Sequence, residues 1–394
     1  MKLFSNDLTG RFVERPNRFL VIIDTPRGRV HAHCPNPGRL QEILLPGTPV
    51  ILEHALKGSR KTEWTLAAAE YKGQIIPLIS VRANRIALEL VLPGLFPEAE
   101  HFRAEYSFEH SRFDFCVETA GRKKSLVEVK SCTLASHGRA MFPDAPTERG
   151  KRHVEHLAEI VRKRKGDPAA GEIIRLAADQ GSPETFDGHV LFILYHPDVK
   201  VFTPHIHTDP GFSLSLEQAS RLIRVRAVSI SCKTSGECSV AGENIPVDFT
   251  PLEHVRQDRG VYLVLLELRR ESFIETGGLG LIRFRAGSYL YAGSAKRNLS
   301  HRLSRHMRRG KKKLHWHIDY LREAADRVRA FPIYTSEDLE CRLAADIRAL
   351  GGVPVPGFGS SDCGCPSHLY YFRDPPVSTR EFQDVLLEYR HSRI

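Results

Sequence analysis

Two β-rich runs on either side of Gly121 carry side chains that could perform chemistry. A polar stretch separates the runs, and this pattern predicts a β-hairpin whose loop is longer than two residues. Because side chains alternate between the two faces of a strand, Glu128 and Lys130 share one face. A hairpin centred near Gly121 places Asp114 opposite Glu128. Two carboxylates and one ammonium group are therefore expected to converge on one point.

This grouping suits the hydrolysis of a phosphodiester bond. Carboxylate oxygens can hold Mg²⁺ or Mn²⁺, and the metal activates a water molecule and neutralises charge on the phosphate. The order Asp114, then Glu128-x-Lys130, resembles the core of PD-(D/E)xK nucleases, with Asp114 and Glu128 as metal ligands. Glu-x-Lys is also common on solvated strand faces, so the spacing alone leaves a solvated face open as the alternative.

Length and composition limit the number of domains and the classes of partner that we expect. A chain of 394 residues predicts two or three domains. The net charge of +10 favours a polyanionic partner, and we expect DNA, with RNA as the alternative and an anionic membrane a distant second. The sequence shows no apolar run of membrane-spanning length and no signal-peptide pattern, and the eight cysteines are scattered. We therefore expect a cytoplasmic protein with reduced thiols and no membrane partner.

The first 83 residues predict a small β-barrel. Six short β-like segments alternate there with turns rich in Pro, Gly and Asn. The segments are residues 11–14, 19–24, 28–33, 49–53, 63–68 and 75–81. Arg18 and Arg39 belong to a set of arginines that could line a groove for phosphates or form a solvated face.

Residues 84–248 predict a mixed α/β domain around the hairpin. A helix at 86–92 contains Glu89, and a longer helix at 147–163 can be capped by Thr147. Arg149 and His153 lie in the first two turns of that longer helix, where they can reach a phosphate near the hairpin. A buried strand at 188–195 and a helix at 214–224 follow.

Five ordered blocks in this region give it a family resemblance. They are residues 33–38 (His-Cys-Pro-Asn-Pro-Gly), 84–86 (Asn-Arg-Ile), 111–115 (Ser-Arg-Phe-Asp-Phe), 127–131 (Val-Glu-Val-Lys-Ser) and 142–153 (Phe-Pro-Asp-Ala-Pro-Thr-Glu-Arg-Gly-Lys-Arg-His). Residues 1 to about 248 resemble the sugar fermentation stimulation family, SfsA. The resemblance implies DNA binding, regulation of sugar catabolism genes, and an OB-like barrel joined to a PD-(D/E)xK domain. It implies an acidic site of Glu89, Asp114, Glu128 and Lys130, with Arg149 and His153 beside it.

A second set of reactive side chains follows a predicted linker at residues 249–256. Two predicted strands carry Tyr262 and Tyr291, and a basic amphipathic helix beginning near Asn298 carries Arg302. Glu340 lies on a later helical stretch. A phenol could orient an attacking water, and a guanidinium group could stabilise the charge that develops on the phosphate, while Glu340 holds a metal ion.

This second block resembles the GIY-YIG nuclease domain. Gly260-Val-Tyr262 and Tyr291-Ala-Gly293 stand for its two signature tripeptides, and the resemblance covers residues from about 257 to 374. It implies Tyr262, Tyr291, Arg302 and Glu340 as catalytic candidates. The helper residues that it implies are Arg305, His306, His315 and His317.

Cysteines near the end of this block raise the question of zinc. Cys363 and Cys365, with His368 and Cys341, could bind Zn²⁺. The Cys-x-Cys spacing is tighter than the two to four intervening residues common in structural zinc sites, so we expect a turn packed over the catalytic face instead. Residues 375–394 are predicted to form a tail with a helix at 379–389.

The predicted fold is a multidomain α/β protein. It comprises an OB-like barrel (1–83), a PD-(D/E)xK nuclease-like domain (84–248) and a GIY-YIG-like domain (257–374). The favoured function is Mg²⁺-dependent cleavage of DNA. The alternative is a non-catalytic DNA-binding regulator of sugar catabolism genes that uses nuclease-like folds only for binding. A homodimer is left open by the sequence.

Overall fold

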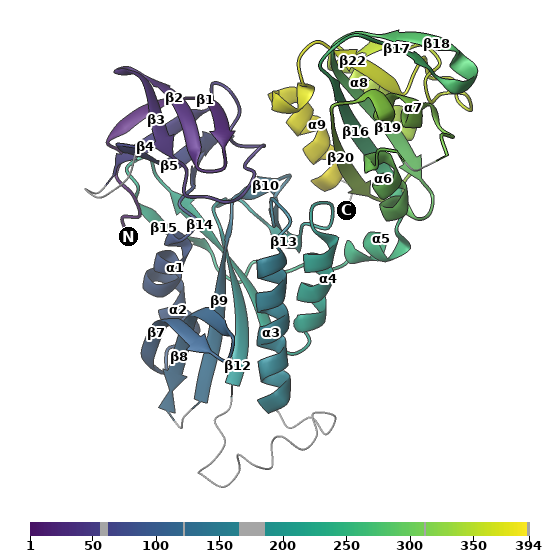
Figure 1. The fold of residues 1–394 in the computed structure, drawn as a ribbon. Coiled ribbons are helices and arrows are strands. Elements are labelled where there is room, and N and C mark those ends of the chain that lie inside the picture. The colour runs from purple at the N-terminus through teal and green to yellow at the C-terminus, as the bar shows by residue number, and fades with distance from the viewer. Residues whose placement is uncertain (56–61, 121–122, 165–185, 311–312, 392–394) are drawn as a thin grey trace. The chain divides into compact units, whose positions relative to one another are not determined.

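The computed structural model describes residues 1–55, 62–120, 123–164, 186–310 and 313–391. The chain divides into two compact units, Met1–Phe249 and Thr250–Ile394 (Figure 1). Gly121, at the centre of the predicted hairpin, lies outside the described residues. Within the described part of the chain, no helix combines the length and the apolar character that crossing a membrane requires.

The first unit begins with the predicted barrel. Its strands are β1 (Leu8–Asn17), β2 (Leu20–Thr25), β3 (Gly28–His33), β4 (Pro49–His54), β5 (Trp64–Tyr71) and β6 (Gln74–Pro77). Strand β1 pairs with both β2 and β4, and β3 pairs with β5, so β1 to β5 close into a ring. Burial alternates along β2, as expected for a strand with one face toward a barrel interior. The OB-like barrel is confirmed.

A short broken helix connects the barrel to the mixed sheet. It comprises α1 (Arg82–Ile86), a π-helical turn (η1, Ala87–Val91) and α2 (Leu92–Leu95). The mixed part then contains β7 (Ala99–Phe108), β8 (Ser111–Thr119), β9 (Lys123–Cys132), β10 (Leu134–Ser136), β11 (Arg139–Phe142), α3 (Glu148–Arg164), β12 (Phe186–Leu194), β13 (Val201–Pro204), α4 (Pro210–Ala219), β14 (Arg224–Cys232) and β15 (Cys238–Gly242).

The main sheet of this part has the order β15-β14-β12-β9-β8-β7. Strand β12 runs parallel to β9 and β14, while the hairpins β7-β8-β9 and β14-β15 are antiparallel. Helices α3 and α4 lie beside each other, and α3 packs on β12 (Figure 1). The mixed α/β sheet predicted from the sequence is therefore confirmed.

Two helix boundaries follow from their caps. The backbone N–H of Gly150 donates to Thr147 Oγ1 at 3.1 Å, so Thr147 caps α3 as predicted. Helix α4 begins four residues earlier than the predicted helix at 214–224, because Asp209 accepts from the N–H of Phe212 and Pro210 occupies the first turn. The predicted end was also wrong, since β14 begins at Arg224.

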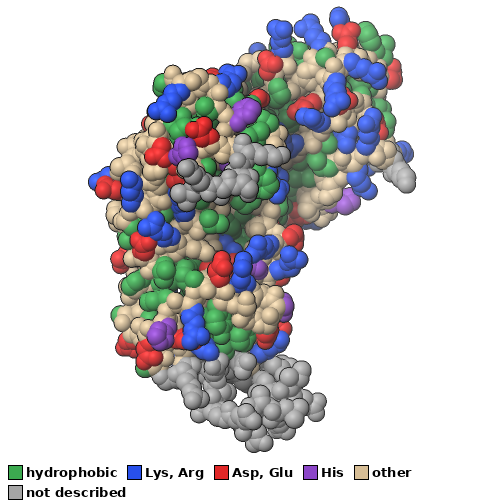
Figure 2. Space-filling view, turned by 60° about the vertical axis from the view of Figure 1, so that its left-hand side comes forward, with side chains coloured by type: hydrophobic (Ala, Val, Ile, Leu, Met, Phe, Trp, Pro, Cys, Tyr) green, Lys and Arg blue, Asp and Glu red, His purple; other side chains and the backbone are tan. Residues whose placement is uncertain are grey.

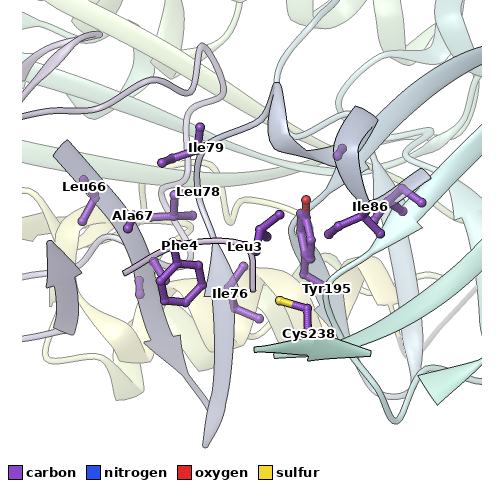
Figure 3. Packing of buried hydrophobic residues seen from close by; sticks show 14 of the residues in the cluster. Leu3, Phe4, Leu66, Ala67, Ile76, Leu78, Ile79, Ile86, Tyr195 and Cys238 are labelled. Carbon is purple, nitrogen blue, oxygen red and sulfur yellow. The ribbon is translucent and has the colours of Figure 1, made fainter. Parts of the chain in front are cut away.

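The barrel and the mixed sheet share one hydrophobic core (Figure 3). Leu66 of β5 and Ile76 of β6 belong to the same buried cluster as Ile86 of α1 and Tyr195, which follows β12. Full burial of a Leu or Ile side chain stabilises a fold by roughly 1.5–3 kcal/mol. The shared core therefore joins the barrel and the sheet into one unit, and it fixes α1 against the sheet.

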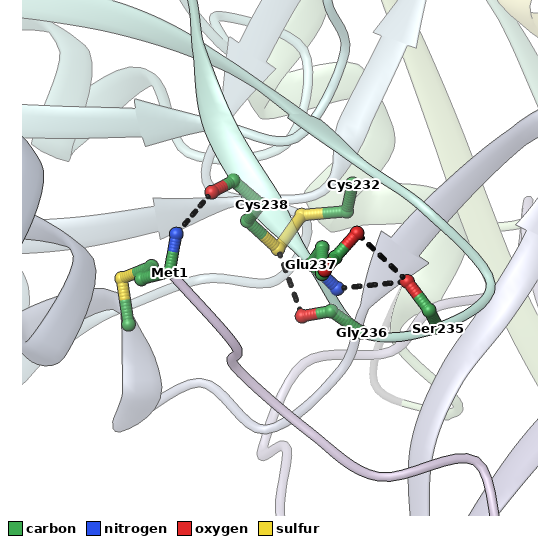
Figure 4. The surroundings of a disulfide bond; sticks show 6 residues. All are labelled: Met1, Cys232, Ser235, Gly236, Glu237 and Cys238. Atoms are coloured by element: carbon green, nitrogen blue, oxygen red, sulfur yellow. Dashed lines mark hydrogen bonds between the residues drawn. A yellow bond between two sulfur atoms is a disulfide. The ribbon is translucent and has the colours of Figure 1, made fainter.

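A disulfide corrects the prediction of eight reduced thiols. Cys232 and Cys238 face each other across the β14–β15 hairpin and are bonded, with Cα atoms 4.2 Å apart (Figure 4). The N-terminal ammonium group of Met1 donates to the carbonyl oxygen of Cys238 at 2.9 Å. The sequence did not reveal the pairing, because it depends on the antiparallel register of two strands that the sequence analysis did not identify.

The second unit is built on an antiparallel sheet of order β20-β16-β19-β22-β21. Its elements are α5 (Leu252–Gln257), β16 (Gly260–Leu268), β17 (Ser272–Glu275), η5 (Gly277–Leu279), β18 (Leu281–Phe284), β19 (Gly287–Ala295), α6 (Leu299–Met307), α7 (His317–Ala324), β20 (Arg327–Tyr334), α8 (Glu340–Ala349), β21 (Val353–Pro354), β22 (Leu369–Phe372), η6 (Pro376–Ser378) and α9 (Arg380–His391). The segment expected to be a linker thus contains α5.

Residues 375–391 are part of the second unit's core, although the sequence suggested a tail. The predicted helix is present as α9, and Phe382 and Leu386 are buried in one cluster with Val261 and Leu263 of β16. Because side chains alternate along β16, Tyr262 points to the opposite face of the sheet from Val261 and Leu263. The apolar core thus occupies one face, and the predicted tyrosine faces the other.

Candidate functional site

The predicted carboxylate pair is assembled by the β8–β9 hairpin. Phe115 pairs with Val127, so the register places Asp114 opposite Glu128, as the sequence predicted. Lys130 Nζ donates to Glu128 Oε1 at 2.5 Å, and His153 Nδ1 of α3 donates to the same oxygen at 2.8 Å. The hairpin and the first turns of α3 therefore bring these four side chains together.

Two neighbours fix the orientation of Asp114. The backbone N–H of Val129 donates to Asp114 Oδ2 at 2.7 Å, and Asn84 Nδ2 of α1 donates to Oδ1 at 2.7 Å. Burial, and then the charge of Glu128, raise the pKa of Asp114 above its ordinary value. The two carboxylates therefore repel each other, while hydrogen bonds from neighbouring groups hold both of them in place.

The pKa of Glu128 is shifted in the opposite direction from that of Asp114. Burial alone would raise its pKa, but the charge of Lys130 and the hydrogen bond from His153 outweigh burial and lower it. Glu128 is 4% exposed, and its Oε2 atom is buried without a hydrogen-bond partner among the described residues. An unpaired buried carboxylate oxygen is costly. A divalent cation held by Glu128 and Asp114 would compensate for that cost.

Glu89 lies in the π-helical turn that follows α1. It is exposed and accepts a hydrogen bond from Arg85 Nε at 2.6 Å, whereas Asn84 of the same helical segment contacts Asp114. The sequence alone did not indicate Asn84 as a site residue, although Asn84 begins the 84–86 block of the family resemblance.

Basic and aromatic side chains lie on the barrel loops. Arg15 donates to the carbonyl oxygens of Arg18 and Arg39 at 2.7 Å and 3.0 Å, which joins two loops. Arg18 and Arg39 themselves are exposed, and so is Phe19, at 55%. Arg149 is exposed in the first turn of α3. An exposed aromatic ring beside guanidinium groups suits base stacking and phosphate contact. Phe19 was missed in the sequence.

The second set of predicted residues also converges. Tyr262 of β16 and Tyr291 of β19 have ring centroids 6.3 Å apart, and the hydroxyl of Tyr262 shares a hydrogen bond of 3.0 Å with His306 Nε2 of α6. A Cβ atom on Gly293 would lie 2.5 Å from the Tyr262 ring, so glycine is required there for the ring to pack. Burial raises the pKa of both tyrosines, which therefore remain neutral phenols.

Arg302 and Glu340 complete this second site. Arg302 donates to the carbonyl oxygen of Ser294 at 2.7 Å, and Ser294 Oγ donates to Glu340 Oε2. Burial would raise the pKa of Glu340, but hydrogen bonds from His368 and Ser294 and the charge of Arg302 lower it. A surface hollow beside them is lined by Ser294, Lys296, Arg297 and Arg302. Many Lys and Arg side chains lie on the visible face of this unit (Figure 2).

The predicted helper residues have mainly positioning contacts. Arg305 donates to the buried carboxylate of Asp319 at 2.7 Å, and the backbone N–H of His315 donates to the same carboxylate at 3.0 Å. His306 is 2% exposed, so it supports Tyr262 from within the fold. The guanidinium groups of Arg302 and Arg305 each lie 4.9 Å from the Trp316 ring centroid, a cation–π platform that the sequence analysis missed.

His317 has a separate place in this unit. Its Nδ1 accepts from the backbone N–H of Gly359 at 3.2 Å, and burial lowers its pKa. It therefore fixes the 355–368 loop.

Comparison with known proteins identifies the first unit. A sugar fermentation stimulation protein homolog of Desulfitobacterium hafniense is 34% identical over 244 residues, which cover 62% of this chain and 97% of that protein. The chain belongs to the sugar fermentation stimulation protein family. A family homolog of Methanothermobacter thermautotrophicus is 36% identical over 220 residues, covering 55% of this chain and 82% of that protein.

Family models match three successive parts of the chain, and a solved structure is similar to part of it. The SfsA N-terminal OB domain matches residues 13–78, the sugar fermentation stimulation protein RE domain matches 81–170, and the domain of unknown function DUF123 matches 261–391. The solved structure of Pyrococcus furiosus SfsA in complex with Ca²⁺ is 27% identical, with a TM-score of 0.51, and covers 63% of this chain and 99% of that one.

Proposed function

We propose that this protein is a metal-dependent nuclease that hydrolyses phosphodiester bonds in DNA. The observation that carries the proposal is the buried Oε2 atom of Glu128, which has no hydrogen-bond partner in the described part of the chain, beside the carboxylate of Asp114. A related protein has been solved with Ca²⁺, which like Mg²⁺ prefers oxygen ligands. We propose Asp114 and Glu128 as the ligands of Mg²⁺ or Mn²⁺ in this chain.

In the first unit, the metal would activate a water molecule and neutralise charge on the phosphate. The protein's own groups hold the geometry. Asn84 and the N–H of Val129 orient Asp114, while Glu128 holds Lys130 beside the site. The ammonium group of Lys130 has further N–H groups, which can donate hydrogen bonds that orient the attacking water or stabilise a phosphate oxygen.

In the second unit, we propose a second hydrolytic site of the GIY-YIG type. Because both phenols stay neutral, Tyr262 and Tyr291 orient a water molecule or a phosphate by hydrogen bonding, and neither serves as a resident phenolate. Arg302 offers its charge to the phosphate at the basic hollow. Glu340 would supply the ligand for a metal ion.

The substrate grip that we propose uses the barrel loops and α3. Arg18, Arg39 and Arg149 would contact phosphates, and Phe19 would stack on an unpaired base. Such contacts do not distinguish DNA from RNA by charge alone. Binding is expected to weaken as salt rises, because cations released from the nucleic acid drive association.

Cleavage of a mixed substrate panel tests the proposal. Single-stranded, duplex and branched DNA and RNA are incubated with Mg²⁺, Mn²⁺ or EDTA. Removing one positioned donor from a hydrolytic site typically lowers the rate about 10²–10³-fold, so we expect losses of this size for Lys130→Ala or Arg302→Ala. The substrate whose cleavage is lost in one single variant shows which unit cleaves it. The double variant should lose cleavage by both units.

Matched controls separate these effects from changes in surface charge. Lys124 shares β9 with Lys130 and has a similarly buried side chain, 18% against 14% exposed, but it lies beside Glu118. Arg348 is exposed at the opposite end of α8 from Glu340. Lys124→Ala and Arg348→Ala should cleave like the unmodified protein. Absence of metal-dependent cleavage of every substrate, with salt-sensitive binding retained, would instead favour the DNA-binding regulator.

A further inference from the structure

Four potential metal ligands come together at the beginning of α8. Cys341, Cys363, Cys365 and His368, named here the Cys₃His cluster, each offer one ligand atom, and these atoms all lie within 4.8 Å of one another. His368 Nε2 lies 3.4 Å from Cys363 Sγ and 3.9 Å from Cys341 Sγ. The three cysteines are not in disulfides.

These distances match the edges of a tetrahedral zinc site. With Zn–S bonds of about 2.3 Å and Zn–N bonds of about 2.0–2.1 Å, the sulfur–nitrogen edge of a regular tetrahedron is about 3.5 Å. The two measured sulfur–nitrogen distances lie on either side of that value. A tight Cys-x-Cys spacing is accommodated because Cys341 and His368 reach the cluster from α8 and from the end of the loop.

His368 is held in the orientation that a metal ligand needs. Its Nδ1 donates to Glu340 Oε1 at 3.1 Å, so Nε2 is directed toward the thiols. A carboxylate that accepts from the second nitrogen of a ligating histidine fixes the tautomer and strengthens the ligand. His368 is 2% exposed, whereas Cys341 is exposed, so the cluster has a rigid base and an open route for an ion.

The loop that carries three of these residues is closed by its own backbone. The N–H of Gly357 donates to the carbonyl oxygen of Pro366 at 3.0 Å, and the N–H of His368 donates to that of Phe358 at 2.8 Å. A bound ion would attach this closed loop to Cys341 of α8. Four protein ligands leave no open position, which is the arrangement of a structural zinc site.

We propose that the Cys₃His cluster binds one Zn²⁺ ion. Three soft thiolates and one imidazole select Zn²⁺ over Mg²⁺, so this site is distinct from the carboxylate site of the first unit. The sequence favoured a simple turn because Cys363 and Cys365 alone are poorly spaced. The fold supplies the other two ligands.

The site has a consequence for Glu340 that rests on the proposed function. His368 is bonded both to Glu340 and, under this proposal, to zinc. The ion would therefore hold the Glu340 carboxylate toward Ser294 and Arg302. In this role Cys341, Cys363, Cys365 and His368 are positioning residues for the second site.

Metal analysis of the full chain tests the zinc site without reference to cleavage. Protein purified without chelator and without added zinc should contain one zinc per chain, released when a mercurial reagent titrates the thiols. Cys363→Ser combined with Cys365→Ser should lose the ion. Cys34→Ala, which removes a buried thiol in the first unit, should retain it. Zinc retained by the double variant, or absent from the unmodified protein even after zinc is supplied, would overturn the proposal.

Cobalt substitution keeps the test decisive if the double variant fails to fold. Co²⁺ added to the metal-free unmodified protein should produce the thiolate-to-cobalt charge-transfer band and the visible bands of tetrahedral cobalt. Zn²⁺ should then displace cobalt and abolish the bands. An octahedral spectrum without charge transfer would refute a Cys₃His site. The two proposals can fail independently, because the double variant should lose zinc while the cleavage activity assigned to the carboxylate site of the first unit stays unchanged.

Discussion

Glu128→Gln tests the metal-binding argument most directly. The substitution keeps the side-chain volume but removes the charge that pairs with Lys130 at 2.5 Å and His153 at 2.8 Å. Charge-assisted hydrogen bonds contribute about 1.5–3 kcal/mol each, and glutamine retains one acceptor. Relief of repulsion with Asp114 opposes the loss. We expect the metal-free variant to be destabilised by about 1–3 kcal/mol.

The metal-dependent part of the stability is the decisive quantity. A ligand that binds only the folded state at about 100 times its Kd stabilises the fold by about 2.7 kcal/mol. We expect Mg²⁺ or Ca²⁺ to stabilise the first unit by this amount in the unmodified protein, and by close to zero in Glu128→Gln. The reason is that Oε2 of Glu128 is buried and has no hydrogen-bond partner among the residues that the structure describes, so it is free to bind an ion.

The assay is urea denaturation followed by tryptophan fluorescence. The chain has two tryptophans, and in a Trp316→Phe background Trp64 of β5 reports on the first unit alone. Glu118→Gln is the matched control, since Glu118 lies on the neighbouring strand and pairs with Arg103 at 3.0 Å. The control should keep the full metal increment. An equal increment in Glu128→Gln would refute the assignment of the ion to this carboxylate.

Two further predictions concern the two units separately. Because the pKa of Asp114 is raised, the folded state binds its proton more tightly than the unfolded state, so without metal the stability contributed by Asp114 falls as pH rises through the raised pKa. As pH rises through that window, Asp114→Asn should therefore gain stability relative to the unmodified protein. Urea denaturation in EDTA at a series of pH values measures the two free energies of unfolding. A difference between them that stays constant with pH would contradict the prediction. Gly293→Ala should destabilise the second unit by about 1–3 kcal/mol, because its Cβ would lie 2.5 Å from the Tyr262 ring. Gly278→Ala, where a Cβ meets nothing within 4 Å, is the control, with Trp316 fluorescence as the reporter.

Features that depend on short-range geometry could be predicted from the sequence. The alternation of side chains along a strand and the centre of a hairpin suffice to set Asp114 opposite Glu128, because the two strands are joined by a short loop. Thr147 capped its helix for an equally local reason. Tyr262 and Tyr291 lie on adjacent antiparallel strands, so the pairing of these two strands brings the two tripeptides together.

The side chains from distant parts of the chain that complete each site could not be predicted from the sequence. Asn84 reaches Asp114 because the shared core fixes the rotation of α1 about its axis. Cys341 joins Cys363 and Cys365 because α8 begins beside the closed loop. The physical reason is the same in both cases. Side chains far apart in sequence meet only where the burial of apolar faces has oriented whole helices, and no local pattern encodes that orientation.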